Sequence, residues 1–440
     1  MLTPITKDTL HVIKDLSFRR YAQMFTRVEE NTLANIESFG VPLGKQMNQK
    51  EKELILTRIR EKEAVFRNND KSIYVNRISS ACEACKTGEG SYTTFISLKC
   101  HRNCYFCFNK NQEDYAQFSV GKKNVEQELL DLLEAGHEFS HLALTGGEPL
   151  LFKEDTVRFF QLAKEKTPRT YTRLYTAGDL LDQETLFQLK ETELDEIRFS
   201  IKMEDSSQKQ THILKKIEMA QQFIPNVLVE MPVIPGTMDN MKELLLKLDD
   251  LGIYGINLLE FCFPLENVQP FIERGFSLKN PPYEKYYNYW YAGGLAVADS
   301  EAMCLELVEF ALDQQLKLGV HYCSLENKHT GQIYQQNRNQ HIDETYMFST
   351  RDHFFKTAKV FGKDKKKVIP VLREHRIPFE IDELHDLVQF PVKSIELLKD
   401  KRVEVGIVSS VVEWQLGERL IREVSIDWTK PNLFRLEDHG

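Results

Sequence analysis

Long apolar runs and any excess of positive charge are missing from this sequence. No apolar run approaches the roughly 18 residues that a membrane-spanning helix requires, and the opening stretch MLTPITKDTLHVIKDL has no apolar segment of the kind found in signal peptides. The 440 residues carry a net charge of −9, whereas nucleic acids and anionic membranes attract proteins through local positive charge. We therefore expect a cytoplasmic protein with no membrane and no nucleic-acid partner.

The sequence also lacks low-complexity tracts, and its pattern changes along the chain. Residues 1–90 are predicted to form a mainly helical N-terminal extension, since NQKEKELILTRIREKEAVF (48–66) has apolar residues at helical spacing. Residues 91–335 alternate between short apolar and amphipathic segments, which predicts parallel strands joined by helical crossovers. Residues 336–440 mix short strands, prolines and helices, and are predicted to form a small α+β accessory domain.

The alternation over residues 91–335 predicts an α/β fold, namely a full or partial (β/α) barrel. Asp299 and Ser300 are expected to cap a helix that begins near residue 301. The expected strands lie at 95–98, 141–147, 173–179, 196–202, 226–236, 255–263 and 318–323, and the expected helices at 124–136, 155–165, 209–222, 239–250 and 301–317.

Cysteine is the residue type whose spacing carries most information. Disulfides are rare in cytosolic proteins, so clustered cysteines in this chain are expected to be metal ligands. The eight cysteines are Cys82, Cys85, Cys100, Cys104, Cys107, Cys262, Cys304 and Cys323.

Three cysteines fall together in CHRNCYFC (100–107), directly after an expected strand. The loop after a barrel strand is where β/α folds place their active sites. A structural zinc ion takes four protein ligands, and His101 is the only nearby fourth candidate beside Cys100, Cys104 and Cys107. An iron–sulfur cubane also takes four ligands, so three thiolates leave one iron open to a small molecule.

The segment CHRNCYFC resembles the CxxxCxΦC signature of the radical S-adenosylmethionine (radical SAM) superfamily, with Phe106 at the aromatic position. The resemblance implies a 4Fe–4S cluster on Cys100, Cys104 and Cys107, with S-adenosylmethionine bound to the fourth iron. It also implies reductive cleavage of S-adenosylmethionine to methionine and a 5′-deoxyadenosyl radical, which abstracts a hydrogen atom from the substrate.

A second motif, LALTGGEPLL (142–151), follows one strand later. Two glycines allow a backbone to approach a ligand closely, and an ordinary strand-to-helix turn is the alternative interpretation. Within the resemblance, Gly146, Gly147, Glu148 and Pro149 match the segment that binds the amino group of S-adenosylmethionine.

Polar residues at later strand ends are weaker candidates for cofactor contact. Ser200 and Lys202 in RFSIK, and Glu230 in VLVEMPVIPG, are expected at the carboxyl end of the barrel, as are Asn257 and Glu260 in INLLEF. Polar groups that are simply satisfied at a barrel rim remain the alternative for each.

A second metal site is predicted from Cys82 and Cys85, which form a CxxC before the first strand, and Cys323, which ends the last one. His321 shares a strand face with Cys323. A mononuclear zinc or iron is favoured here over an auxiliary cluster or no metal. The fourth-ligand candidates are His321, His329, Cys262 and solvent, whereas Cys304 is expected in the core.

Residues 80–335 resemble most the branch related to pyruvate formate-lyase activating enzymes and, more loosely, the methanogen enzyme that C-methylates an arginine of methyl-coenzyme M reductase. A peptide or protein substrate is expected, because the large N-terminal extension and the C-terminal domain could frame a macromolecule. The expected partner is a reductant such as flavodoxin or ferredoxin. Alternatives are a cobalamin-dependent C-methyltransferase, although the DxHxxG cobalamin signature is absent, and a glycyl-radical activase. A non-catalytic zinc-binding protein is the alternative from another class.

Overall fold

The computed structural model describes residues 2–46, 48–287 and 293–438. The described residues fall into two compact units, neither of which is continuous in sequence. Unit 1 takes its residues from Met1–Gly40, Tyr283–Tyr289 and His329–Gly440, and unit 2 from Val41–Pro282 and Trp290–Lys328. The expected N-terminal segment 1–90 therefore contributes to both units.

Unit 2 is built on a nine-stranded sheet with the strand order β2-β3-β12-β9-β8-β7-β6-β5-β4. The strands from β4 to β12 pair in parallel, while β3 pairs antiparallel with β12 and β2 antiparallel with β3. The bounds are β2 Val65–Arg67, β3 Ser72–Val75, β4 Ser91–Phe95, β5 His141–Thr145, β6 Tyr171–Thr176, β7 Glu196–Phe199, β8 Asn226–Val233, β9 Gly255–Glu260 and β12 Gly319–Cys323.

Among the described residues, β2 and β4 are the two ends of this strand order. The α/β fold with a parallel sheet is confirmed. The segment 1–90, predicted to be mainly helical, also contains the strands β2 and β3. These strands form a hairpin, and the turn between them is made by Asn68, Asn69 and Asp70 at positive φ, a conformation that Asn and Asp adopt more readily than most residues.

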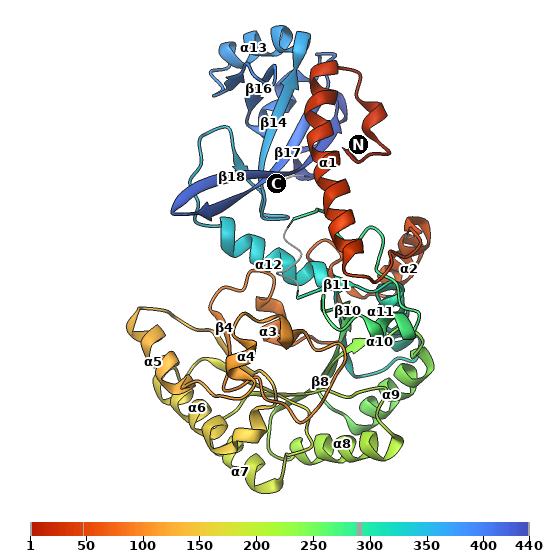
Figure 1. The fold of residues 1–440 in the computed structure, drawn as a ribbon, viewed down its shortest axis with the longest axis vertical. Helices are drawn as coiled ribbons and strands as arrows, with labels where there is room; N and C mark the ends of the chain where they lie inside the picture. Colours follow the sequence, from red (N-terminus) through yellow and green to blue (C-terminus); the bar gives the residue numbers. More distant parts are fainter. Residues whose placement is uncertain (1, 47, 288–292, 439–440) are drawn as a thin grey trace. The chain divides into compact units, whose positions relative to one another are not determined.

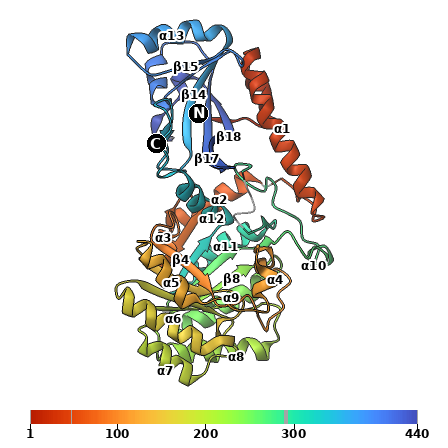
Figure 2. The same cartoon turned by 60° about the vertical axis from the view of Figure 1, so that its left-hand side comes forward.

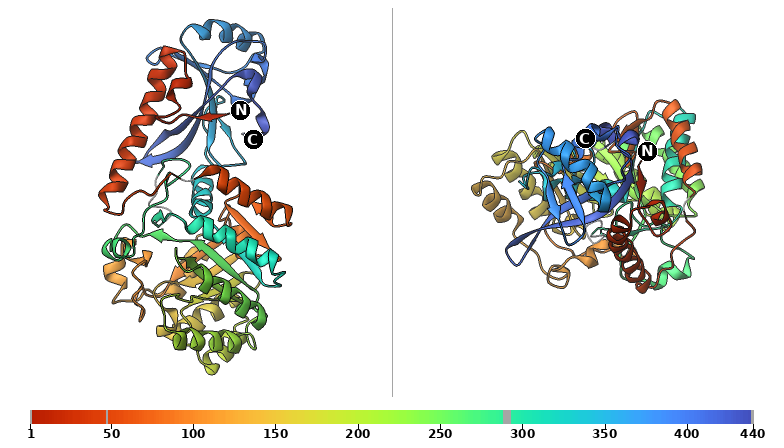
Figure 3. Two further views of the ribbon diagram at one scale, coloured as in Figure 1. Left: turned by 90° about the vertical axis from the view of Figure 1, so that its right-hand side faces the viewer. Right: turned by 90° about the horizontal axis from the view of Figure 1, so that it is seen from above.

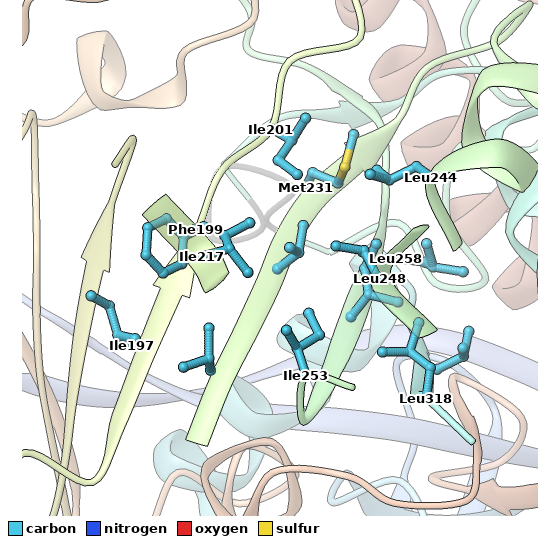
Figure 4. Packing of buried hydrophobic residues seen from close by; sticks show 14 of the residues in the cluster. Ile197, Phe199, Ile201, Ile217, Met231, Leu244, Leu248, Ile253, Leu258 and Leu318 are labelled. Atoms are coloured by element: carbon cyan, nitrogen blue, oxygen red, sulfur yellow. The ribbon is translucent and has the colours of Figure 1, made fainter. Parts of the chain in front are cut away.

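Helices α5 to α9 and α11 cover one face of this sheet, called here the outer face (Figures 1 and 2). Leu248, Ile253 and Leu318 belong to the apolar layer at this face, which Figure 4 shows. The helices are α2 Gln49–Glu61, α3 Ser80–Ala84, α4 Tyr115–Phe118, α5 Val125–Glu134, α6 Lys153–Lys166, α7 Gln183–Glu191, α8 Ser207–Ala220, α9 Met238–Leu251, α10 Gln269–Glu273 and α11 Ser300–Asp313.

The expected cap at Asp299 and Ser300 is corrected by the structure. Asp299 lies in the left-handed region with φ +67° and its side chain makes no capping hydrogen bond. The Ser300 hydroxyl instead accepts from the Phe261 N–H and donates to the Val233 carbonyl. Ser300 therefore ties α11 to the sheet rather than capping the helix.

The other face of the sheet, called here the inner face, is polar. Successive strand residues point to opposite faces, and Leu174, Ile197 and Val229 belong to the apolar layer of the outer face. The residues that alternate with such apolar ones are Arg173, Tyr175, Arg198, Glu230, Asn257, His321 and Cys323.

Unit 1 is an antiparallel sheet that combines both ends of the chain. Helix α1 lies along the strands of the C-terminal sheet (Figure 3). The Phe18 ring of α1 stacks on Phe361 with 4.4 Å between centroids, and the Asp15 carboxylate caps the helix. The elements are α1 Leu16–Ser38, α12 Leu325–Asn337, which begins in unit 2, α13 Lys365–Glu374, β1 Thr3–Pro4, β13 Met347–Phe348, β14 Phe355–Phe361, β15 Glu380–Asp382, β16 Leu387–Phe390, β17 Val405–Gln415 and β18 Glu418–Thr429.

No helix within residues 2–46, 48–287 and 293–438 is long and apolar enough to cross a bilayer.

Candidate active site

The cysteine triplet lies on the loop that follows β4, at the carboxyl edge of the parallel strands. All three thiols are free; Cys100 is exposed, and Cys104 and Cys107 are half-buried. Burial raises the pKa of Cys100 and Cys107, and the Cys104 thiol raises both further. The Arg102 N–H donates a hydrogen bond of 3.3 Å to the Cys100 Sγ. The structure thus brings the predicted triplet together.

Arg102 fixes this loop to the loops that follow β6 and β7. Its guanidinium donates to both carboxylate oxygens of Asp179, at 2.7 and 2.6 Å, and to Asp205 at 2.6 Å. His101 also contacts Asp179, with 2.8 Å between Nε2 and Oδ2. Burial raises the pKa of Asp179, but the bonds from Arg102 and His101 outweigh it and leave that pKa lowered. His101 therefore faces a carboxylate in this structure.

Aromatic rings hold the same loop on its other side. Phe106, predicted at the aromatic position, meets Tyr105 edge-on at 5.0 Å and Phe261 at 5.6 Å between ring centroids. Tyr105 also contacts Phe271 at 5.3 Å. Such edge-to-face pairs are each worth about 1 kcal/mol beyond their buried area, so Phe106 anchors the loop between two thiols.

The glycine pair packs against the backbone that leads into Cys100. The Gly147 N–H donates to the Ser97 carbonyl at 3.0 Å. A Cβ on Gly147 would lie 2.0 Å from the Lys99 carbonyl oxygen, and one on Gly146 would lie 2.6 Å from Phe95. The two glycines are thus required by the approach of one loop to another, a reason that the motif alone did not reveal.

Glu148 is buried beside this contact, with 2% of its surface exposed. Its carboxylate accepts hydrogen bonds from the Thr176 hydroxyl and from the backbone N–H groups of Ala177 and Leu150. Burial raises the pKa of Glu148 despite these bonds. A carboxylate has about four acceptor positions, so one remains for a further donor. Pro149 begins the 3₁₀ turn that follows.

The weaker candidates at later strand ends divide between two places. Ser200 donates to the backbone carbonyl of Glu230 at 3.4 Å, while the Glu230 carboxylate accepts from Arg198 and from Asn257. These residues lie on the inner face. Glu260 instead pairs with Lys279 at 2.9 Å and lies apart from that group.

The second set of cysteines meets at the inner face. Helix α3 brings Cys82 against it, where the Cys82 Sγ accepts hydrogen bonds from Arg198 at 3.2 Å and Asn257 at 3.3 Å. Burial raises the pKa of Cys85, and the Cys82 thiol adds to this. Burial followed by Cys85 raises the pKa of Cys323 to about 12. The three residues predicted as a second metal site are therefore neighbours.

The four candidates for completing that second site differ in position. His321 lies between Ser72 and Asn257, with contacts of 2.9 and 3.0 Å from its two ring nitrogens. Cys262 interacts electrostatically with Lys328, which also interacts with Cys323 and Cys85. His329 belongs to unit 1. Solvent is the fourth candidate, and Cys304 is buried in the core, as expected.

Metal assignments at both cysteine sets stay predictions. Over residues 2–46, 48–287 and 293–438, no group of three or more His, Cys, Asp or Glu side chains is arranged to hold a metal ion. The donor types nevertheless fit the predicted cluster, since the triplet supplies free thiols on one loop and no side chain of the described residues donates a hydrogen bond to them.

Comparison with known proteins decides the family. The Radical SAM superfamily matches residues 94–248, which include the cysteine triplet, the glycine pair and the strands from β5 to β8. Residues 94–248 of this chain are a radical SAM domain. The chain accordingly takes a 4Fe–4S cluster and S-adenosylmethionine as cofactors, and the alternative of a non-catalytic zinc-binding protein is set aside.

One relative shares most of the length of this radical SAM enzyme. A protein of Methanocaldococcus jannaschii, named as a glycyl-radical enzyme activating enzyme, is 28% identical over 327 residues, which cover 70% of this chain and 80% of that protein. The expected relationship to pyruvate formate-lyase activating enzymes is confirmed. The looser resemblance to the arginine C-methyltransferase stays a prediction.

Solved structures show more limited likeness. The S-adenosylmethionine-bound SuiB of Streptococcus suis has a TM-score of 0.39 at 14% identity and covers 54% of this chain, which spans 50% of its length. The structure of anSMEcpe with bound AdoMet and a Cp18Cys peptide has a TM-score of 0.33 at 16% identity, with 40% and 52% of the two chains covered. This chain thus spans about half of those proteins.

Sequence reasoning missed the charged side chains that surround both cysteine sets. Arg102 lies inside the recognised motif, but its partners Asp179 and Asp205 follow other strands. Arg173 and Arg198 did carry a local signal. Each alternates with apolar residues along its strand, and polar residues at period two identify one face of a strand.

Proposed function

We propose that this radical SAM enzyme binds its 4Fe–4S cluster on Cys100, Cys104 and Cys107 and abstracts a hydrogen atom from a peptide or protein substrate. The observation that supports the cluster assignment is the packing of the glycine pair, Gly146 and Gly147, against the backbone that enters the triplet. When bound, the cluster and S-adenosylmethionine supply the electron transfer and the 5′-deoxyadenosyl radical of this reaction.

The chain's own residues position and shield this chemistry. Arg102 holds the cysteine loop through Asp179 and Asp205, and the rings of Tyr105 and Phe106 pack its other side away from water. Glu148 keeps one acceptor position for the ammonium of S-adenosylmethionine. The loop thus has little freedom to move, which keeps reacting atoms in register.

A macromolecular substrate is favoured by the relative whose name describes the activation of a glycyl-radical enzyme. Modification of a peptide or protein side chain is the leading form of this proposal. A glycyl-radical activase, which would abstract hydrogen from a main-chain glycine, is the second candidate. A reductant such as flavodoxin or ferredoxin would serve either. Cobalamin, and zinc or iron on Cys82, Cys85 and Cys323, stay predictions.

The first experiment is an elemental count on protein purified without oxygen, with iron, sulfide, zinc and cobalt measured per chain. We expect about four irons and four sulfides, a visible spectrum bleached by dithionite, and 5′-deoxyadenosine after S-adenosylmethionine is added. A colourless protein that binds zinc alone after reconstitution would overturn the cluster assignment. Cobalt in the preparation would favour the methyltransferase alternative.

The substrate class needs a separate measurement. The enzyme, reductant and S-adenosylmethionine are incubated with a proteome from the source cells, and the products are followed by electron paramagnetic resonance and peptide mass spectrometry. A stable glycyl-radical signal would favour the activase, whereas a mass change at a side chain would favour the leading proposal. 5′-Deoxyadenosine formed only with small molecules would contradict both.

A further inference from the structure

Two cations at the inner face of unit 2 form no hydrogen bond and no ion pair with the described residues. Arg173 is placed on β6, its Nε is buried without a hydrogen bond, and its guanidinium carbon lies 5.2 Å from the centre of the Tyr175 ring. Lys328 lies in the first turn of α12, with its Nζ 5.9 Å from the centre of the Phe108 ring. Ring contacts attract cations but accept no conventional hydrogen bond.

Arg173 and Lys328 interact electrostatically with the same two groups of the inner face. The carboxylate of Glu230 interacts electrostatically with Arg173 and with Lys328, and so does the thiol of Cys85. Lys328 therefore lies on the same side of the sheet as Arg173, although α12 and β6 are far apart in sequence.

The ion pairs of the inner face leave out Arg173 and Lys328. Arg198 forms ion pairs with both Glu196 and Glu230, so each of these two carboxylates already has a cationic partner. Arg173 and Lys328 add two further positive charges, and neither forms an ion pair with a carboxylate of the described residues. Both side chains are half-buried, and removing a cation from water without an anionic partner is unfavourable, so an anionic group bound by both would complete the site.

Phe108 places this region next to the cysteine loop. It directly follows Cys107, the last residue of the triplet, and its ring is the one that Lys328 approaches. A group held by Lys328 would therefore lie beside the loop that carries the predicted cluster ligands. Phe108 is also half-exposed, with 50% of its surface accessible, so this loop has an open side.

We propose that Arg173 and Lys328 bind a carboxylate of the substrate at the inner face of unit 2. This inference rests on the proposed function and adds the chemical class of the group that is recognised. A carboxylate supplies an anionic partner for both cations, and it accepts hydrogen bonds from a guanidinium and an ammonium together. Peptides carry such groups at the C-terminus and on Asp and Glu.

The test is a fluorine NMR titration of the full chain, purified without oxygen, with trifluoroacetate as the carboxylate probe. Trifluoroethanol, which has the same fluorinated group and no charge, is the matched neutral probe. We expect saturable broadening of the trifluoroacetate signal alone. Lys328→Met and Arg173→Met should each weaken this binding by about tenfold or more, since each removes one charge-assisted hydrogen bond, whereas Arg173→Lys should retain most of it.

Lys190→Met is the control variant, because Lys190 lies on the exposed surface of α7 and should leave trifluoroacetate binding unchanged. Thermal unfolding of each variant checks that it is folded, and Lys328→Met decides the question if Arg173→Met does not fold. Equal binding of trifluoroacetate by the wild type and Lys328→Met would overturn the proposal, as would equal broadening of the neutral probe.

S-adenosylmethionine also carries a carboxylate, so the titration is repeated at a saturating concentration of it. Retained trifluoroacetate binding supports a substrate site, and full displacement would assign the two cations to the cofactor instead and overturn the proposal. Iron content and 5′-deoxyadenosine formation are measured on the same samples. Their loss with trifluoroacetate binding intact would overturn only the proposed function, while the reverse result would overturn only the carboxylate site.

Discussion

The two cysteine sets of unit 2 have similar spacing signals but opposite surroundings. The loop set of Cys100, Cys104 and Cys107 is held from outside by an ion-pair network and aromatic rings, and its thiols are left without side-chain hydrogen-bond donors among the described residues. In the inner set, Cys82 accepts hydrogen bonds from Arg198 and Asn257. The loop set is therefore supported from outside while its sulfurs stay free of side-chain hydrogen bonds, whereas the inner set is part of a polar network.

From this difference we predict that one residue type serves two purposes in one domain. A thiol that must bind a group from solution needs a fixed backbone and a free sulfur. A thiol that is already hydrogen-bonded by a cation contributes to stability as it stands. The comparison leads to five predictions, which are given from the largest expected effect to the smallest.

Replacing a loop cysteine should remove activity without unfolding the chain. For Cys104→Ala we expect loss of S-adenosylmethionine cleavage to background, because the predicted cluster would lose one of its thiolates. Measurement of 5′-deoxyadenosine and of iron per chain checks this, with far-ultraviolet circular dichroism as the folding control. Cleavage at the wild-type rate would refute the cluster assignment.

The glycine pair, Gly146 and Gly147, should tolerate no side chain. Gly147→Ala would place a Cβ 2.0 Å from the Lys99 carbonyl oxygen, and such overpacking destabilises by about 3 kcal/mol. Gly121→Ala is the matched control, since its nearest contact is 3.1 Å away. Urea unfolding and iron content would be measured for both. Equal stability of the two variants would show that the loop moves aside easily.

Replacing an inner cysteine should mainly affect stability. Cys82→Ala removes the acceptor of hydrogen bonds from Arg198 and Asn257, and losing a bond to a buried charged group costs about 2 kcal/mol. We also expect the metal content to fall by one ion. If the metal content stays unchanged while stability falls, the prediction of a second metal site is wrong, and Cys82 serves only the polar network.

The free energy of unfolding should fall in acid because of a buried histidine at the inner face. Burial, followed by the charge of Arg198, lowers the pKa of His321 to about 3 in the folded protein, against an ordinary value of 6.5. The neutral ring therefore adds stability that is complete above pH 6.5 and is lost as the pH falls towards 3. At pH 5 the expected loss is about 2 kcal/mol. Urea unfolding at pH 7 and pH 5 measures it, and His321→Gln should lose this part of the pH dependence.

The smallest effect is expected for Arg102→Lys, which tests the support of the loop set. Lysine keeps the charge but cannot reach Asp179 and Asp205 with a guanidinium fork, so the loop should be loosened by about 1 kcal/mol. We expect lower iron occupancy at equal added iron and sulfide, with the fold intact. Arg158→Lys is the control, since Arg158 pairs with acidic residues on the exposed helix surface. Equal iron occupancy in both variants would show that Arg102 does not support the cysteine loop.

Sequence reasoning succeeded where the chemistry is local. The triplet spans eight residues, and the glycine turn follows the next strand of the sheet, so residue type and order were enough to predict both. The cap of α11 was predicted wrongly because Ser300 found partners in the sheet, the Phe261 N–H and the Val233 carbonyl. Tertiary hydrogen bonds can outweigh local capping preferences in this way.

The sequence by itself determined the alternation of strands and helices, the cysteine loop and the glycine turn, because each depends on neighbouring residues. Only the tertiary structure decided that helix α1 packs on the C-terminal sheet and that Arg173, Arg198 and Lys328 share one face. These residues are separated by other strands and helices. They meet because strand pairing and burial of the outer face bring the remaining polar side chains together.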